Sequence, residues 1–204
     1  MREDSGGADG ILEVVSIGGG AAEIVIWNPD GSQAEMSGNG TRIAARWLAE
    51  RTGCARVDIR VGDRGVAALV RDDGLVEQDM GPVQTGAGEV VDGIEFVPVS
   101  VGNPHAVVVG DPGEILRIGP LLETHARFPG RTNVQVARID GPGRVTARVW
   151  ERGVGETASS GTSAVAVAAA THGEGTVVVS FPGGELTVRL EGGRATLIGP
   201  AERD

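Results

Sequence analysis

The sequence of 204 residues contains no lysine, because all 18 of its basic residues are arginine. Without a lysine amine, the protein cannot form a Schiff base with pyridoxal phosphate or with a carbonyl substrate. A phosphate-binding P-loop lysine and a catalytic Ser-x-x-Lys pair are excluded for the same reason. Whatever chemistry the chain performs therefore proceeds without these amine-dependent mechanisms.

Cysteine, histidine and long apolar runs are also scarce. The single cysteine, Cys54, cannot form an internal disulfide, which is typical of a reducing compartment, and we expect it to be a small buried hydrophobe. His125 and His172 have no cysteine or carboxylate at metal-ligand spacing, which argues against a metal site. No apolar run reaches the roughly 18 residues of a membrane helix, and the first residues do not resemble a signal peptide. We therefore expect a cytoplasmic protein.

The composition indicates an acidic chain with an aliphatic core. Hydrophobic residues make up 40% of the sequence, whereas aromatic residues make up only 3%. The core must therefore consist of Val, Ile, Leu and Ala, in one large domain or two small ones. The net charge of −10 argues against nucleic acid or an anionic membrane as the main partner. The charged stretch 123–127 is interpreted as a solvated helix end.

An internal repeat relates the two halves of the chain. Trp27 is followed ten residues later by Ser37-Gly38, and Trp150 is followed ten residues later by Ser160-Gly161, so that both pairs are separated by 123 residues. Each Ser-Gly pair precedes a helix-forming stretch and then a strand-like stretch, and each unit closes on a Gly-Pro pair. Four matches in the same order are difficult to attribute to chance.

Strand-like segments outnumber helices in both halves. Strands are expected at 24–27, 57–61, 66–70, 95–99, 106–109, 148–150, 177–181 and 185–190. Each half has one apolar helix, at 41–48 and at 164–170, and the second is apolar enough to be buried on all sides. The predicted fold class is α/β (α+β), with two pseudo-twofold-related lobes in which a mixed sheet wraps around a central helix. We expect residues 1–93 to form the N-terminal lobe and residues 94–204 to form the C-terminal lobe.

Each Ser-Gly pair is expected to start a helix, whose first backbone N–H groups have no partner inside the helix. We expect the helix starts at Ser37 and Ser160 to face each other across a cleft between the lobes, where two positive dipole ends would hold a carboxylate. Alternatively, each serine is an ordinary helix cap and Gly-Asn-Gly is an ordinary turn. The shared offset of the tryptophans and Gly-Pro pairs favours a common site.

Four segments resemble signatures of the diaminopimelate epimerase family. Asn28–Arg42 resembles the first signature, and Trp150–Thr162 resembles the second. Gly102–His105 resembles the Gly-Asn-Pro-His segment of the family, and Phe128–Val134 resembles its next substrate-contacting stretch. The resemblance extends from about residue 7 to Pro200 and thus covers nearly the whole chain.

The resemblance implies a cofactor-independent, homodimeric epimerase that interconverts LL- and meso-diaminopimelate in the synthesis of lysine and peptidoglycan precursors. In the family, one cysteine at a helix start removes the α-proton from one face, and a second cysteine delivers a proton to the other face. The resemblance places Ser37 and Ser160 in these two catalytic positions, with His105 and Glu151 tuning their pKa values. The implied substrate-binding residues are Asn28, Gly38, Asn39, Asn103, Asn133, Glu151, Arg152, Gly161 and Thr162.

Some of these residues also indicate the kind of substrate. Asn28, Asn103 and Asn133 are implied to bind ammonium and carboxylate groups. Arg152 is implied to clamp the distal carboxylate in a bidentate manner. The backbone N–H groups at Gly38-Asn39 and Gly161-Thr162 would hold the reacting α-carboxylate as charge develops on it.

Two departures from the family bear on activity. Both cysteine positions hold serine, and a hydroxyl ionises several units above a thiol, whose pKa is about 8.5. The chain also starts after the opening strand and helix of the family, so we expect an unpaired sheet edge in the first lobe.

Three explanations of the serines remain open: a natural enzyme that uses hydroxyls, a deliberate double Cys-to-Ser change, and a silent homologue that binds a small amino acid. A hydroxyproline epimerase- or dehydratase-like isomerase is a further alternative. Glu151-Arg152 argues against it, because this pair indicates a second, distal charged group on the substrate.

Overall fold

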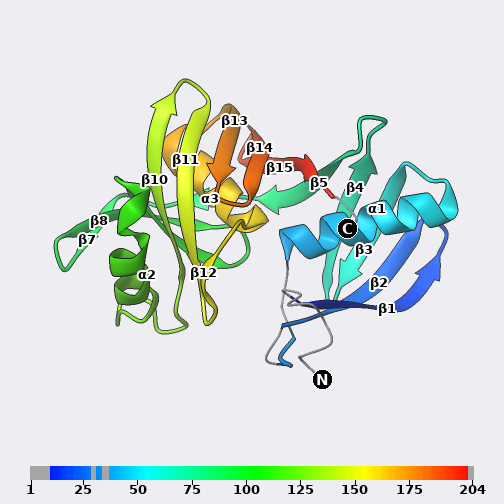
Figure 1. Cartoon of the computed structure of the whole chain (residues 1–204), viewed down its shortest axis with the longest axis horizontal. Coiled ribbons are helices and arrows are strands. Elements are labelled where there is room, and N and C mark those ends of the chain that lie inside the picture. Colours follow the sequence, from blue (N-terminus) through cyan, green and yellow to red (C-terminus); the bar gives the residue numbers. More distant parts are fainter. Residues whose placement is uncertain (1–9, 29–30, 34–36, 202–204) are drawn as a thin grey trace. The chain divides into compact units, whose positions relative to one another are not determined.

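The computed structural model of the chain describes residues 10–28, 31–33 and 37–201 (Figure 1). Residues 29–30 and 34–36 of the first signature, and residues 8–9 before it, lie outside the described residues. The described chain forms two compact units: one runs to Asp79 and takes in Pro200 and Ala201, and the other is Met80–Gly199. The boundary expected at 93/94 therefore lies inside the second unit, because Val83 N–H donates to Gly193 O and strand β6 (Gln84–Thr85) pairs with β8 (Ile94–Ser100) there.

The first unit is a sheet with one helix packed against it. Its elements are β1 (Ile11–Gly18), β2 (Ala21–Trp27), α1 (Gly38–Thr52), β3 (Arg56–Val61), β4 (Arg64–Val70) and β5 (Leu75–Pro82), which continues into the second unit. β1 and β2 are antiparallel, whereas β2 and β3 are parallel and connected through α1. β3, β4 and β5 follow as antiparallel neighbours. β1 ends the strand order, and its side chains are almost all exposed, as expected for a sheet edge.

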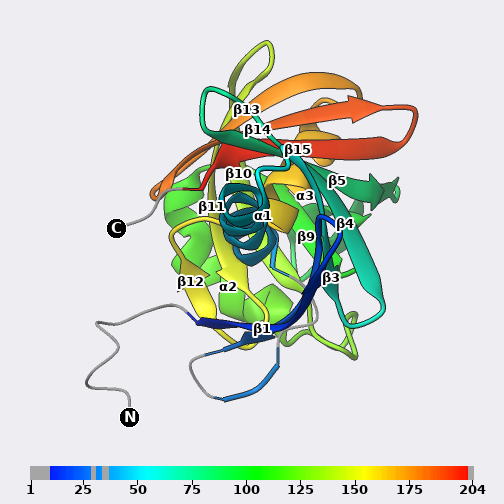
Figure 2. The ribbon, with the colours of Figure 1, turned by 90° about the vertical axis from the view of Figure 1, so that its right-hand side faces the viewer.

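The second unit repeats this order and adds elements before it. The additional elements are β6, β7 (Glu89–Val91), β8, β9 (Pro104–Val109), the 3-10 turn η1 (Pro112–Glu114) and α2 (Ile115–Glu123). The repeated elements are β10 (Asn133–Gly141), β11 (Arg144–Glu151), α3 (Gly161–Thr171), β13 (Gly175–Phe181), β14 (Gly184–Glu191) and β15 (Arg194–Pro200), and β12 (Gly155–Thr157) pairs with β11. β13, β14 and β15 run side by side as orange-to-red strands (Figure 2).

The pairing pattern confirms the internal repeat that the sequence predicts. β10 and β11 are antiparallel, β11 and β13 are parallel and connected through α3, and β13, β14 and β15 are antiparallel. This is the order and sense of β1 to β5 around α1. Trp27 ends β2 and Trp150 lies next to the end of β11, while Ser37 and Ser160 are both N-cap residues. The predicted pseudo-twofold relation of the lobes stays a prediction.

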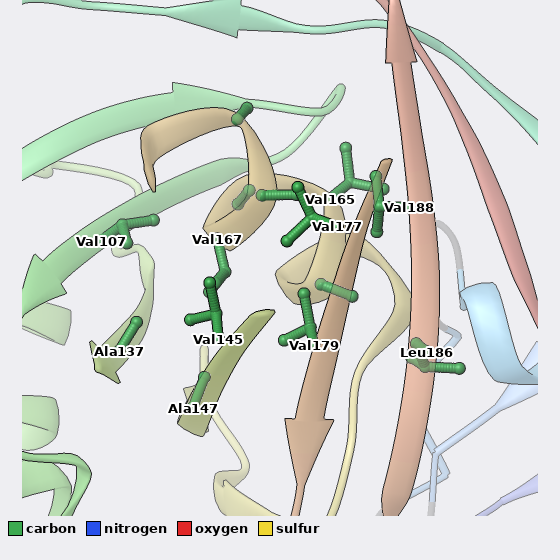
Figure 3. Packing of buried hydrophobic residues seen from close by; sticks show 14 of the residues in the cluster. Val107, Ala137, Val145, Ala147, Val165, Val167, Val177, Val179, Leu186 and Val188 are labelled. Carbon is green, nitrogen blue, oxygen red and sulfur yellow. The ribbon is translucent and has the colours of Figure 1, made fainter. Parts of the chain in front are cut away.

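Aliphatic side chains build both cores, as the composition requires. In the second unit, Val165 and Val167 of α3 pack among Val145, Val177 and Val188 from the surrounding strands (Figure 3). Every residue from Gly161 to Ala169 is buried, which confirms the prediction for this helix. In the first unit, α1 contributes four residues to a core with β2, β3 and β4: Ala44, Ala45, Leu48 and Ala49.

Two local expectations are wrong. The expectation of one helix in each half is wrong for the second half, which also contains α2, although Gly119 and Pro120 disfavour a helix there. Only glycine fits at position 119, because a Cβ would come within 2.7 Å of the Trp150 side chain. Cys54 is exposed rather than buried, because Gly53 ends α1 in the left-handed conformation and Cys54 follows in the turn. Within the described residues, no helix is long and apolar enough to cross a membrane.

Candidate active site

Ser37 caps the first of the two duplicated helices. Its extended backbone, with φ −137° and ψ 119°, precedes α1, and its Oγ accepts a hydrogen bond from Gly40 N–H at 3.1 Å. The Ser37 carbonyl accepts from Thr41 N–H at 2.9 Å and from the Thr41 hydroxyl at 2.9 Å. The hydroxyl proton of Ser37 is not used by the cap, because the oxygen serves there as an acceptor. Ser37 is half-buried.

A buried arginine stabilises this helix start from within. Arg42 donates to Gly38 O at 3.3 Å, to Asn39 Oδ1 at 2.8 Å and to Pro200 O at 3.2 Å, so none of these acceptors is a carboxylate. Burial lowers the pKa of Arg42 to about 10, which leaves it cationic at neutral pH. Together with the positive end of the helix dipole, this charge favours an anion at the start of α1.

Asn28 lies in the turn that follows β2. Its Nδ2 donates to Ser32 Oγ at 2.9 Å, and its backbone N–H donates to Ser32 O at 2.8 Å. Gly31 N–H donates back to Asn28 O at 3.0 Å. Asn28, Ser37, Gly38 and Asn39 are therefore the predicted site residues that belong to the first unit.

Ser160 caps the second duplicated helix in a different way. Its backbone is again extended, and its carbonyl accepts from Ala164 N–H at 3.0 Å. Among the described residues, its hydroxyl forms no cap hydrogen bond to α3. Ser160, Gly161 and Thr162 are all buried, so the predicted residues of this helix start lie at the edge of the core.

His105 lies at the centre of a buried polar network in the second unit. Its Nε2 lies 3.0 Å from Asn103 Oδ1, and its Nδ1 lies 3.0 Å from Gln135 Nε2. Gln135 Nε2 also donates to Ser163 Oγ at 2.9 Å. Burial lowers the pKa of His105 from 6.5 to about 3, with a smaller contribution in the same direction from the charge of Arg152. His105 is therefore neutral at physiological pH.

Asn133 positions the turn that carries Glu151 and Arg152. Its Nδ2 donates to Pro104 O at 2.9 Å, and its Oδ1 accepts from Arg152 N–H at 3.0 Å. The Arg152 side chain donates to Gly130 O at 3.4 Å. Asn133 thus contacts Arg152, which follows Glu151 at the end of β11, and its register partner His105 contacts Asn103.

Glu123 is a positioning residue that the sequence does not reveal. Its carboxylate, only 8% exposed, accepts from Trp150 Nε1 at 2.7 Å and from Gly153 N–H at 2.7 Å, and it pairs with Arg131 at 3.3 Å. The interpretation of 123–127 as a solvated helix end is wrong for this residue. Because its partners lie on both sides of Glu151-Arg152, Glu123 fixes the turn between them.

Each unit by itself offers groups that can bind an anion. A start of α1 or α3 offers backbone N–H donors to an anion, and Arg152 offers a cation. Within the described residues, no group of three or more His, Cys, Asp or Glu is arranged to hold a metal ion.

Comparisons with known proteins match most of the chain. The family model described as "Diaminopimelate epimerase" matches residues 1–86 and 97–203. The diaminopimelate epimerase of Desulforudis audaxviator is 36% identical over 229 aligned positions, which cover 96% of this chain and 82% of that protein. The diaminopimelate epimerase of Pseudomonas syringae pv. tomato is 37% identical over 205 aligned positions, which cover 87% of this chain and 74% of that protein.

A solved structure supports the fold. A hydroxyproline epimerase from Agrobacterium vitis, with bound trans-4-hydroxy-L-proline, has a TM-score of 0.71 at 19% identity, over 97% of this chain and 74% of its own. At this identity the likeness concerns the fold alone. The family match and the two relatives, by contrast, extend over most of the chain and include both serine helix starts. The chain belongs to the diaminopimelate epimerase family, whose members are isomerases that act on amino acids.

Proposed function

We propose that this protein interconverts LL- and meso-diaminopimelate, with Ser37 and Ser160 as the acid–base pair. The observation that carries the proposal is that two N-cap serines occupy equivalent places in a duplicated topology. They are accompanied by the asparagine, glutamate and arginine residues of the family signatures. Relatives named diaminopimelate epimerase, at 36% and 37% identity, support the choice of substrate.

The proposed reaction exchanges one proton for another at the α-carbon. An ionised Ser hydroxyl takes the α-proton, and the electron pair of the C–H bond remains on the substrate, delocalised into its α-carboxylate. The other Ser hydroxyl gives its proton to the opposite face, so the stereocentre is inverted and the two serines exchange protonation states. The N–H groups at the starts of α1 and α3 stabilise the carboxylate as its negative charge increases.

Arg152 and Glu151 account for selectivity in this proposal. A cationic guanidinium binds a distal carboxylate, and a carboxylate binds a distal ammonium group. Diaminopimelate carries both groups at its second stereocentre, whereas a proline-sized substrate has neither. No cofactor takes part in the proposed reaction, because the substrate's own carboxylate accepts the charge.

A silent binding protein is the second candidate, and one observation favours it. Ser37 Oγ is engaged as the cap acceptor for Gly40 N–H, and a hydroxyl is in any case a much weaker acid than a thiol. A protein that retains the binding residues without the thiols would hold diaminopimelate and release it unchanged.

Exchange of the α-proton in heavy water separates these functions. LL- and meso-diaminopimelate are incubated with the wild-type protein and with the Ser37→Cys/Ser160→Cys variant, and the α-proton signal is followed by NMR. We expect slow exchange with the wild type and an increase of about 100-fold or more in the variant, since a thiol is the better general base. Exchange by the variant alone would support the silent binder.

Absence of exchange and of ligand-induced line broadening in both proteins would exclude diaminopimelate as the ligand. An Asn133→Asp/Arg152→Gln background serves as the control for non-specific exchange, because it removes two of the proposed binding contacts.

A further inference from the structure

The NH₂ group of Gln135 faces the ring of His105 in the structure, and this orientation permits one protonation pattern of the ring. An amide NH₂ group only donates, so Gln135 Nε2 requires His105 Nδ1 to be an acceptor. A neutral imidazole has one N–H, which must then be on Nε2. That N–H donates to Asn103 Oδ1, 3.0 Å away. The protonation pattern of the ring is thus determined from the side of Gln135.

The same pattern determines which end of the Asn103 amide remains available. Its oxygen is engaged by the His105 N–H, so its NH₂ group is the part that can meet a ligand. Asn103 is half-buried, whereas His105 and Gln135 are 1% and 0% exposed. Asn103 is therefore the member of the network nearest to solvent. An NH₂ donor binds a carboxylate and repels an ammonium group.

A glutamine at position 135 destabilises the fold. Its Oε1 is buried and has no hydrogen-bond partner among the described residues. An unpaired buried polar atom destabilises a fold by about 1–3 kcal/mol, and an apolar side chain of similar size would avoid that loss. A glutamine at this position is best explained by what its NH₂ group does to His105.

We propose that Gln135 is a positioning residue that holds His105 in the Nε2–H tautomer and thereby presents Asn103 as a hydrogen-bond donor to a substrate carboxylate. The tautomer rests on the geometry of the network alone. The identity of the carboxylate ligand rests on the proposed function, with diaminopimelate as the ligand.

The chain offers a favourable test, because it has only three histidines. His172 Nε2 accepts from Gly143 N–H at 3.1 Å, so this ring is expected in the opposite tautomer, with its proton on Nδ1, 2.9 Å from Thr171 Oγ1. Long-range ¹H–¹⁵N correlation spectra of histidine-labelled protein distinguish the two tautomers. Variants His125→Gln and His172→Gln assign the remaining signal to His105.

For the wild type, we expect the Nε2–H pattern at His105 and the Nδ1–H pattern at His172. In Gln135→Glu, a carboxylate replaces the amide and can only accept, so His105 should gain a proton on Nδ1. Ser163→Ala is the matched control, since it removes the other partner of Gln135 and should leave His105 as Nε2–H. An Nδ1–H pattern in the wild type, or an unchanged spectrum in Gln135→Glu, would overturn the proposal.

Gln135→Met is the second variant for the tautomer test, in case Gln135→Glu does not fold. It removes the donor without adding charge, and we expect a mixture of both tautomers at His105. A pure Nε2–H signal in this variant would show that Gln135 does not determine the tautomer.

Binding of meso-diaminopimelate, measured by calorimetry, tests the step from His105 to the ligand. Gln135→Met should weaken binding about twofold or more, in proportion to the share of His105 that leaves the Nε2–H tautomer, whereas Ser163→Ala should leave it nearly unchanged. Unchanged affinity in Gln135→Met, with the tautomer altered, would overturn the role of Asn103 as donor. If the wild type shows the expected tautomer but binds no diaminopimelate, the proposed substrate fails while the tautomer assignment stands.

Discussion

The helices α1 and α3 occupy equivalent places in a duplicated topology, yet they differ in burial. In α3, the residues from Gly161 to Ala169 are all buried, because strands from both parts of the second unit, β8 and β9 as well as β13 and β14, pack around it. In α1, Ile43 is 47% exposed, and it lines an apolar pocket with Leu12 and Trp47. The hydrophobic pattern and the turns of the sequence thus define the topology, whereas the number of strands packed around a helix determines how much of that helix is buried.

The two helix starts differ as well. Ser37 Oγ accepts from Gly40 N–H, while among the described residues Ser160 makes no side-chain cap bond. Arg42 adds a buried positive charge at the start of α1, whereas the first turn of α3 contains Ser163, which accepts a hydrogen bond from the neutral Gln135. Equivalent positions in a repeat are therefore not chemically equivalent, and the two serines of the proposed acid–base pair have different surroundings.

The largest expected effect is on stability, when a buried side chain of α3 and a half-exposed side chain of α1 are shortened. Val167→Ala should destabilise the protein by about 2 kcal/mol, because it removes two buried methyl groups from a helix without space to relax. Ile43→Ala should change stability by less than about 0.5 kcal/mol, since Ile43 is half-exposed. Denaturant unfolding, together with hydrogen exchange resolved to each helix, measures both. Equal losses in the two variants would contradict the difference in burial.

The next effect is the pH dependence of the free energy of unfolding. The histidine contribution to it arises in the second unit, because all three histidines lie there. The pKa of His105 falls from 6.5 to about 3 on burial, so between these values the unfolded chain binds a proton that the folded chain does not. Stability is therefore lost as the pH falls below 6.5, by up to about 1.4 kcal/mol per pH unit, and is unaffected by this group above 6.5.

Urea unfolding between about pH 7 and about pH 5 measures this loss. His105→Gln is the comparison, because subtracting its pH dependence from that of the wild type cancels the contributions of the carboxylates. A difference between the two proteins that stays constant over this range would show that His105 is not held neutral by the fold.

Local sequence signals predicted much of this structure, and the misinterpreted Glu123 and the overlooked Gln135 have a common cause. The eight strands expected above, both helices at Ser-Gly and the repeat follow from local patterns or from matching motifs, whereas strands such as β1, β5, β10 and β15 were not predicted. Glu123 was misread because its partners, Trp150 and Gly153, are 27 and 30 residues away in the chain. Gln135 and His105 are likewise 30 residues apart. A polar side chain whose hydrogen-bond partner is distant in the sequence leaves no signal in the residues next to it.

The smallest effect compares the two caps directly. Ser37→Ala should destabilise the start of α1 by about 1 kcal/mol, because Gly40 N–H loses its acceptor, whereas Ser160→Ala should change α3 by a few tenths at most. Hydrogen exchange of the Gly40 amide reports the first change, and exchange at the first turn of α3 reports the second. Ser37→Asp is the control, since a carboxylate also accepts at an N-cap and should retain the protection of Gly40. If Ser160→Ala exposed its helix start as much as Ser37→Ala does, the two serines would be equivalent caps, and the chemical asymmetry of the proposed acid–base pair would have to arise from Arg42 and from the Gln135–Ser163 contact.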